Sequence, residues 1–192
     1  MHYFKDNKTW KQITREERLF CAQLYFQIEN RTKDFVEWLI RQNNCPLPIE
    51  LANSKWEAGY EVCMYRDWIK EFGWKGEKSI NRTEFASLKK RTFDLCLFSE
   101  RNIILIEAKA KCGYDRIQLP FIEKDKEVVA RLLGKNLNDI FLVSIHSSLY
   151  KPRQSTLNVF DGYIHWLELL NSPFKVEEFE RADNIRDSKS KL

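Results

Sequence analysis

The sequence predicts an α/β fold, in which helices flank a central sheet and a helical extension precedes it. The first 70 residues have helical periodicity, whereas the segments 91–98 and 103–110 have the composition of two neighbouring strands. A further helix, an apolar strand and a last helix follow. This order is typical of a layered α/β or α+β architecture. Of the 192 residues, 43% are hydrophobic and 14% are aromatic, which is enough to bury the core of one domain.

The N-terminal region is expected to be helical. Residues 14–17 form a capping box, and apolar residues at helical spacing follow it as far as Ile28. A second helix begins after Thr32 and ends before Pro46, because proline cannot continue a helix. We therefore assign residues 1–50 to a helical extension that packs on the core or mediates formation of a homodimer.

A third helix is predicted over residues 55–72. Residues 54–57 match a second capping box, aromatic residues follow at helical spacing, and Gly73 marks the end. The segment 80–88 is compatible with a strand or with an extended arm.

The second half of the chain begins with two strands, 91–98 and 103–110, joined by a short polar turn. The remaining predicted elements are a helix over 121–133, a strand over 139–145 and a helix over 166–170. We assign residues 51–186 to one domain and residues 187–192 to a polar tail.

Charged residues interrupt the second of these strands. Glu107 and Lys109 are two positions apart and therefore project from one face of the strand. If the hairpin loop has two or four residues, Asp94 lies directly opposite Glu107, and an odd-numbered loop would place them on different faces. Both even-numbered loops leave the other face wholly apolar. Its members are Phe93, Leu95, Leu97, Ile104, Ile106 and Ala108.

An acid–acid–lysine set of this kind suits metal-dependent chemistry. Opposed side chains on neighbouring strands lie about 5 Å apart, so two carboxylates there repel each other unless a cation joins them. Mg²⁺, or Mn²⁺ in its place, prefers such oxygen ligands. An ammonium group nearby can stabilise the charge that develops on a phosphate. The set therefore predicts hydrolysis of a phosphodiester.

The motif resembles that of the PD-(D/E)xK nuclease superfamily. Asp94 is followed after twelve residues by Glu107-Ala108-Lys109, and the likeness extends over residues 56–147. It implies a restriction-endonuclease-like core with a mixed sheet. Asp94, Glu107 and the Ala108 carbonyl would bind the metal, and Lys109 would position the attacking water. The chain departs from the pattern at Phe93, where the family motif has proline.

The resemblance also implies two assisting residues, a glutamate on the preceding helix and a glutamine after the lysine. Gln118 fits the second role. For the helix acid we favour Glu61 over Glu57, because Glu57 already belongs to a capping box, and Glu84 is a third choice.

Basic residues flank the hairpin. Lys89, Lys90 and Arg91 precede it, and Lys111 and Arg116 follow it. They form either a solvated edge or a set of contacts to nucleic-acid phosphates. The net charge of +4, from 32 basic and 28 acidic residues, does not by itself indicate nucleic-acid binding.

These observations predict a Mg²⁺-dependent, endonuclease-like hydrolase that acts on nucleic acid, with DNA as the favoured substrate. Two alternatives stay open. In the first, Asp94, Glu107 and Lys109 are ordinary surface charges on a solvated strand face. In the second, the chain is a catalytically silent nuclease-like module that binds nucleic acid or a partner in a larger defence or mobile-element complex. We expect a cytoplasmic protein without a membrane span, because no apolar run approaches ~18 residues and no apolar signal segment begins the chain.

Overall fold

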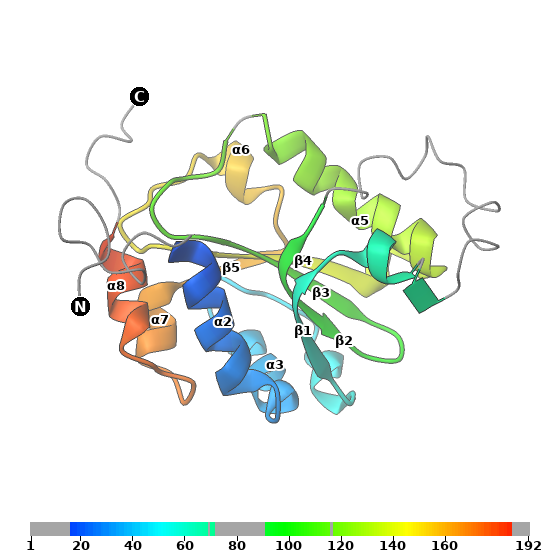
Figure 1. The fold of residues 1–192 in the computed structure, drawn as a ribbon, viewed down its shortest axis with the longest axis horizontal. Helices are drawn as coiled ribbons and strands as arrows, with labels where there is room; N and C mark the ends of the chain where they lie inside the picture. Colours follow the sequence, from blue (N-terminus) through cyan, green and yellow to red (C-terminus); the bar gives the residue numbers. More distant parts are fainter. Residues whose placement is uncertain (1–15, 69, 72–90, 116, 186–192) are drawn as a thin grey trace.

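A five-stranded mixed sheet lies at the centre of the molecule, with its strands in the order β1-β2-β3-β4-β5 (Figure 1). The computed structural model describes residues 16–68, 70–71, 91–115 and 117–185. The strands are β1 (Glu57–Val62), β2 (Phe93–Phe98), β3 (Ile103–Lys109), β4 (Ile140–His146) and β5 (Gly162–His165). β2 pairs antiparallel with both β1 and β3, whereas β3, β4 and β5 run parallel to one another. The predicted α/β class with a central sheet between helices is confirmed.

Helices cover both faces of this sheet (Figure 1). One face carries α2 (Glu16–Ile28), α3 (Thr32–Ile40), α7 (Trp166–Leu170) and α8 (Glu178–Asn184). The other face carries α5 (Leu119–Leu133), and the short α6 (Gln154–Leu157) lies between β4 and β5 along the chain. Helix α5 ends at Gly134, whose φ of 61° is the left-handed conformation that commonly ends a helix.

Two apolar clusters, one on each face, form the core. Phe20 and Leu24 of α2 and Phe35 of α3 pack against β2, β3, β4 and β5 on the first face. Val128 and Val129 of α5 pack against the second. Apolar residues of the N-terminal helices therefore pack within the chain, and the predicted homodimer stays a prediction.

The hairpin of β2 and β3 has the predicted register. Residues 95–98 pair with residues 103–106, and Ser99 and Asn102 close a four-residue turn between them. The predicted apolar face belongs to the first cluster as expected, through Leu95, Leu97, Ile104, Ile106 and Ala108. Phe93 is the exception, because the pairing of β2 with β3 stops at Leu95 and the Phe93 side chain lies in the second cluster.

The prediction of a helix over residues 55–72 is wrong. Residues 57–62 form β1 and pair with β2, and only residues 64–68 and 70–71 are helical in this part of the chain. Ser54 is extended and ends the preceding turn instead of capping a helix. Pairing with the apolar strand β2 outweighs the local helical spacing of the aromatic residues. Glu61 has a φ of 51°, in the left-handed region, although β1 keeps the same register with β2 on both sides of it.

Strand β5 and helix α8 were not among the predicted elements. β5 has four residues and only a weak alternation, yet it pairs with β4. The Tyr163 amide also donates to the Asn44 carbonyl at 2.8 Å, so the segment after α3 covers the outer edge of the sheet.

None of the helices in the described parts of the chain is long and apolar enough to cross a membrane.

Candidate active site

The predicted acids and lysine lie at one end of the strands in the sheet, where β2 begins and β3 ends. Asp94 is the second residue of β2, and Glu107 and Lys109 are among the last three residues of β3. The register places Asp94 opposite Glu107, but the strands separate here. A side-chain bond replaces the backbone pair, because the Ala108 amide donates to Asp94 Oδ2 at 2.8 Å.

The pKa of the Asp94 carboxyl is strongly shifted at this position. Its pKa rises from 3.8 to about 7, first because burial disfavours the charged carboxylate and second because Glu107 is nearby. The Ala108 amide and Lys109 oppose this rise. Glu107 is therefore close enough to Asp94 to raise the pKa of that carboxyl.

Glu107 is buried and contacts two cations. Lys109 Nζ lies 3.0 Å from Glu107 Oε1, and an Arg91 terminal nitrogen lies 3.0 Å from Glu107 Oε2. The pair with Lys109 shows that both side chains project from one strand face, as the spacing of two predicts. Each oxygen of this carboxylate has a cationic partner.

Lys109 is held as an ammonium ion. Burial disfavours its charged form, but Glu107, Glu17 and Asp94 outweigh burial and raise its pKa above the ordinary value. Its Nζ also lies 5.7 Å from the centre of the Tyr114 ring. At neutral pH this group can donate hydrogen bonds and offset negative charge, but it cannot accept a proton.

Arg91 lies inside the site. We predicted that it contacts phosphate, whereas its side chain is only 22% exposed and its Nε bonds Asp125 Oδ2 of α5 at 2.7 Å. Asp125 is itself buried, and burial raises its pKa to about 6 even though Arg91 opposes the change. Sequence reasoning missed Asp125 because it lies in the middle of a helix with no motif around it.

The helical glutamate that contacts Lys109 is Glu17, whereas Glu61 makes its contact elsewhere. Glu17 Oε1 accepts a hydrogen bond from the Ala110 amide at 3.3 Å, and Glu17 Oε2 lies 3.8 Å from Lys109 Nζ. Glu61 lies on β1 and pairs with Arg18 at 3.1 Å. Glu17 was overlooked because it was assigned to a capping box at the start of α2.

The other predicted site residues lie farther out or outside the description. Gln118 is exposed at the position before α5, Lys111 is exposed after β3, and Glu57 is exposed at the start of β1. Lys89, Lys90, Arg116 and Glu84 lie outside the described residues.

Tyr114 links the site to β4. Its hydroxyl donates to the Glu107 carbonyl at 2.9 Å and lies 2.7 Å from Ser144 Oγ, which lies 2.8 Å from His146 Nδ1. Because the Tyr114 proton goes to the carbonyl, Ser144 donates to Tyr114, and His146 must donate to Ser144. This buried chain fixes the end of β3 from the side of α5.

The donor set suits a hard divalent cation in chemistry and in charge. Three carboxylates, on Glu17, Glu107 and Asp125, contact the two cations Arg91 and Lys109, and the carboxylate of Asp94 is near enough to Glu107 and Lys109 to feel their charge. When all are ionised, two negative charges are in excess. Within the described residues no three acidic, histidine or cysteine side chains form a ready metal cluster, so a cation would use two carboxylates, a carbonyl and water.

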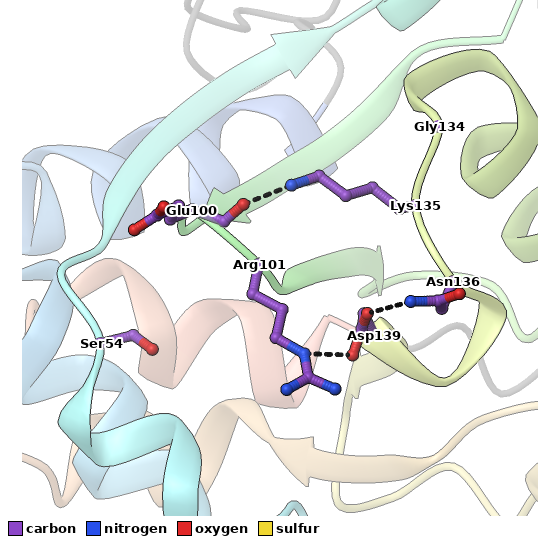
Figure 2. A pocket seen from close by; sticks show the side chains of 7 residues that line it. All are labelled: Ser54, Glu100, Arg101, Gly134, Lys135, Asn136 and Asp139. Atoms are coloured by element: carbon purple, nitrogen blue, oxygen red, sulfur yellow. Dashed lines mark hydrogen bonds and ion pairs between the residues drawn. The ribbon is translucent and has the colours of Figure 1, made fainter.

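A separate hollow of about 530 Å³ lies at the other end of the sheet, beside the turn between β2 and β3 (Figure 2). There Arg101 and Asn136 converge on Asp139 at 2.9 and 3.1 Å, and the Lys135 ammonium bonds the Glu100 carbonyl. These polar groups satisfy one another and close this end of the sheet.

No family model, curated protein or solved structure matches the chain.

Proposed function

We propose that this chain is a Mg²⁺-dependent nuclease of the PD-(D/E)xK type that hydrolyses phosphodiester bonds of nucleic acid, with DNA as the favoured substrate. One observation carries the proposal. When its acids are all ionised, the group around Asp94, Glu107 and Lys109 has two more negative charges than positive ones where β2 begins and β3 ends. A divalent cation would balance this excess.

Asp94 and Glu107, with the Ala108 carbonyl, would hold Mg²⁺ or Mn²⁺. The bound ion would polarise the scissile phosphate and offset the charge that develops on it. Since Lys109 stays protonated, its part is to donate hydrogen bonds to the attacking water or to a phosphate oxygen. The proton of that water must leave to another acceptor.

Glu17 is the fourth member of the proposed site. It bonds the amide of Ala110 and pairs with the Lys109 ammonium. It thereby restrains both the direction of that ammonium and the path of the chain after β3. Glu17 takes the place of Glu61 in the proposed mechanism, whereas a role for Gln118 rests on the resemblance alone.

A cleavage assay on single- and double-stranded DNA and RNA with Mg²⁺ tests the proposal. We expect Asp94→Asn, Glu107→Gln and Lys109→Ala to lower the rate about 100-fold or more, because each removes a group that acts on the developing charge. Glu17→Gln should impair cleavage more than Glu61→Gln.

Glu100→Gln is the matched control, because Glu100 is exposed in the turn at the far end of the hairpin. It should cleave like the wild type. Undiminished cleavage by Asp94→Asn or Lys109→Ala, with the fold intact by circular dichroism, would remove the basis of the assignment.

A second function is favoured by one specific contact. Because Arg91 and Lys109 engage both oxygens of Glu107, the chain also suits a catalytically silent module that binds nucleic acid or a partner protein. Such a module would bind nucleic acid without cleaving it under any metal condition, and substitution of Asp94 would leave that binding unchanged.

A further inference from the structure

Each oxygen of Glu107 already has a cationic partner. Lys109 Nζ lies 3.0 Å from one oxygen and Arg91 lies 3.0 Å from the other. Mg²⁺ and Mn²⁺ bind carboxylate oxygen directly at short range. Two positive groups on Glu107 repel an incoming divalent cation, so if Glu107 is a ligand, as the proposed function requires, we expect one of the two side chains to move away.

Lys109 is poorly placed to leave. It follows Glu107 by two residues on the same strand, its side chain is only 13% exposed, and Glu17 holds its ammonium from a second direction. Its movement would also break the contact with the Tyr114 ring. Its position is therefore fixed by groups that do not depend on Glu107.

Arg91 has a second acid to which it can withdraw. Its terminal nitrogen contacts Glu107, while its Nε separately contacts Asp125 Oδ2 at 2.7 Å. The second bond can persist when the first is broken. Since an unpaired buried charge is costly, Asp125 makes the release of Glu107 by Arg91 much more favourable than release into an apolar site.

We propose that Arg91 is the internal counter-ion that a divalent cation displaces from Glu107, and that Asp125 is the positioning residue that holds Arg91 before and after this exchange. The inference rests on the proposed metal site and adds a pair of residues to it. In the exchange, the guanidinium loses one carboxylate, the incoming cation gains it, and no covalent bond changes.

The exchange predicts a distinctive pattern of Mn²⁺ affinities. Arg91→Gln removes the competitor, so Mn²⁺ should bind about tenfold more tightly, which corresponds to about 1.4 kcal/mol. Asp125→Asn removes the acid that receives Arg91, so Arg91 stays on Glu107 and Mn²⁺ should bind about tenfold more weakly. In the Arg91→Gln background, Asp125→Asn should change the affinity little, because no guanidinium is left to hold.

Titration of the full chain with Mn²⁺, followed by electron paramagnetic resonance and calorimetry, measures these affinities without any substrate. Arg101→Gln is the matched control, because Arg101 also pairs with a buried aspartate, Asp139, but at the far end of the sheet. It should bind Mn²⁺ like the wild type. The double variant guards against misfolding, since it leaves neither buried charge of the pair unpartnered.

The outcomes separate the inference from the proposed function. Equal Mn²⁺ affinity in the wild type and Arg91→Gln overturns the exchange, while loss of binding in Asp94→Asn still supports the metal site. Binding by Arg91→Gln but not by the wild type overturns the exchange and supports the silent module. A penalty from Asp125→Asn that persists without Arg91 overturns the positioning role. Absence of binding in every variant overturns both proposals.

Discussion

At the scale of single residues, the pKa of Asp94 reflects both its burial and the charges around it. Burial and Glu107 raise its pKa from 3.8 to about 7, so the folded protein holds a proton that the unfolded chain has already lost in this range. The free energy of unfolding should therefore fall as the pH rises from about 4 to 7. Asp125, whose pKa rises to about 6, acts in the same direction over the lower part of this range.

We predict that Asp94→Asn removes most of this pH dependence in metal-free protein. At pH 8 the variant should be more stable than the wild type by about 1–3 kcal/mol, because no buried charge has to be formed there. At pH 4 the two should be similar. Urea denaturation in EDTA across this range measures the difference, and Glu100→Gln provides the control. A wild type that gains stability between pH 4 and 7 relative to Asp94→Asn would contradict the prediction.

Residues on one hairpin were predictable, whereas those brought to it from elsewhere were not. The spacing of Glu107 and Lys109 and an even-numbered loop were sufficient to place Asp94 at the same end of the strands. Asp125, Glu17 and Tyr114 reach this place through the packing of α5, α2 and the loop after β3. No periodic pattern specifies which helix end approaches which strand end.

At the scale of elements, a strong hydrophobic pattern was what made most helices and strands predictable. Helix α5, the two hairpin strands and β4 have either a clear stripe or a continuous apolar run, and their predicted bounds lie within two residues of the observed ones. The segment 55–72 failed because its aromatic spacing is compatible with a helix, while its actual structure depends on the neighbouring strand β2. Edge strands take their conformation from the partner more than from their own residues.

The short strand β5 illustrates the same dependence and can be tested at Gly162. A methyl group there would lie 2.7 Å from the Cys45 Cα atom, which belongs to the segment that covers the sheet edge. We predict that Gly162→Ala lowers the free energy of unfolding by about 1–3 kcal/mol, because backbone cannot yield as a flexible side chain can.

Urea denaturation compares Gly162→Ala with Gly134→Ala. Gly134 has open space around it, so its substitution tests only the cost of a positive φ, about 1–2 kcal/mol. Crowding at Gly162 should also disturb the hydrogen bond from Tyr163 to Asn44, which the exchange rate of the Tyr163 amide reports. Wild-type stability and exchange in Gly162→Ala would mean that the segment does not pack against β5 as described.

At the scale of the whole molecule, the sheet joins the two apolar clusters. Neighbouring residues on one strand, such as Leu95 and Cys96, belong to opposite clusters. The site depends on both layers, because Glu17 comes from α2 on one face and Asp125 from α5 on the other. Glu17 and Ala110 are 93 positions apart in the chain. A layer that loosened by itself would therefore remove part of the site.

We predict that the two layers unfold together. Val128 is fully buried on α5, and Val128→Ala should lower the free energy of unfolding by about 2 kcal/mol. Since the sheet is shared, amides of α2 on the opposite face should lose the same protection against hydrogen exchange as amides of α5. Phe121→Ala, on the same helix but at a side chain that is 58% exposed, should leave both layers nearly unchanged. Faster exchange confined to α5 in Val128→Ala would show that the layers open independently, and Glu17 could then stay in place while Asp125 leaves the site.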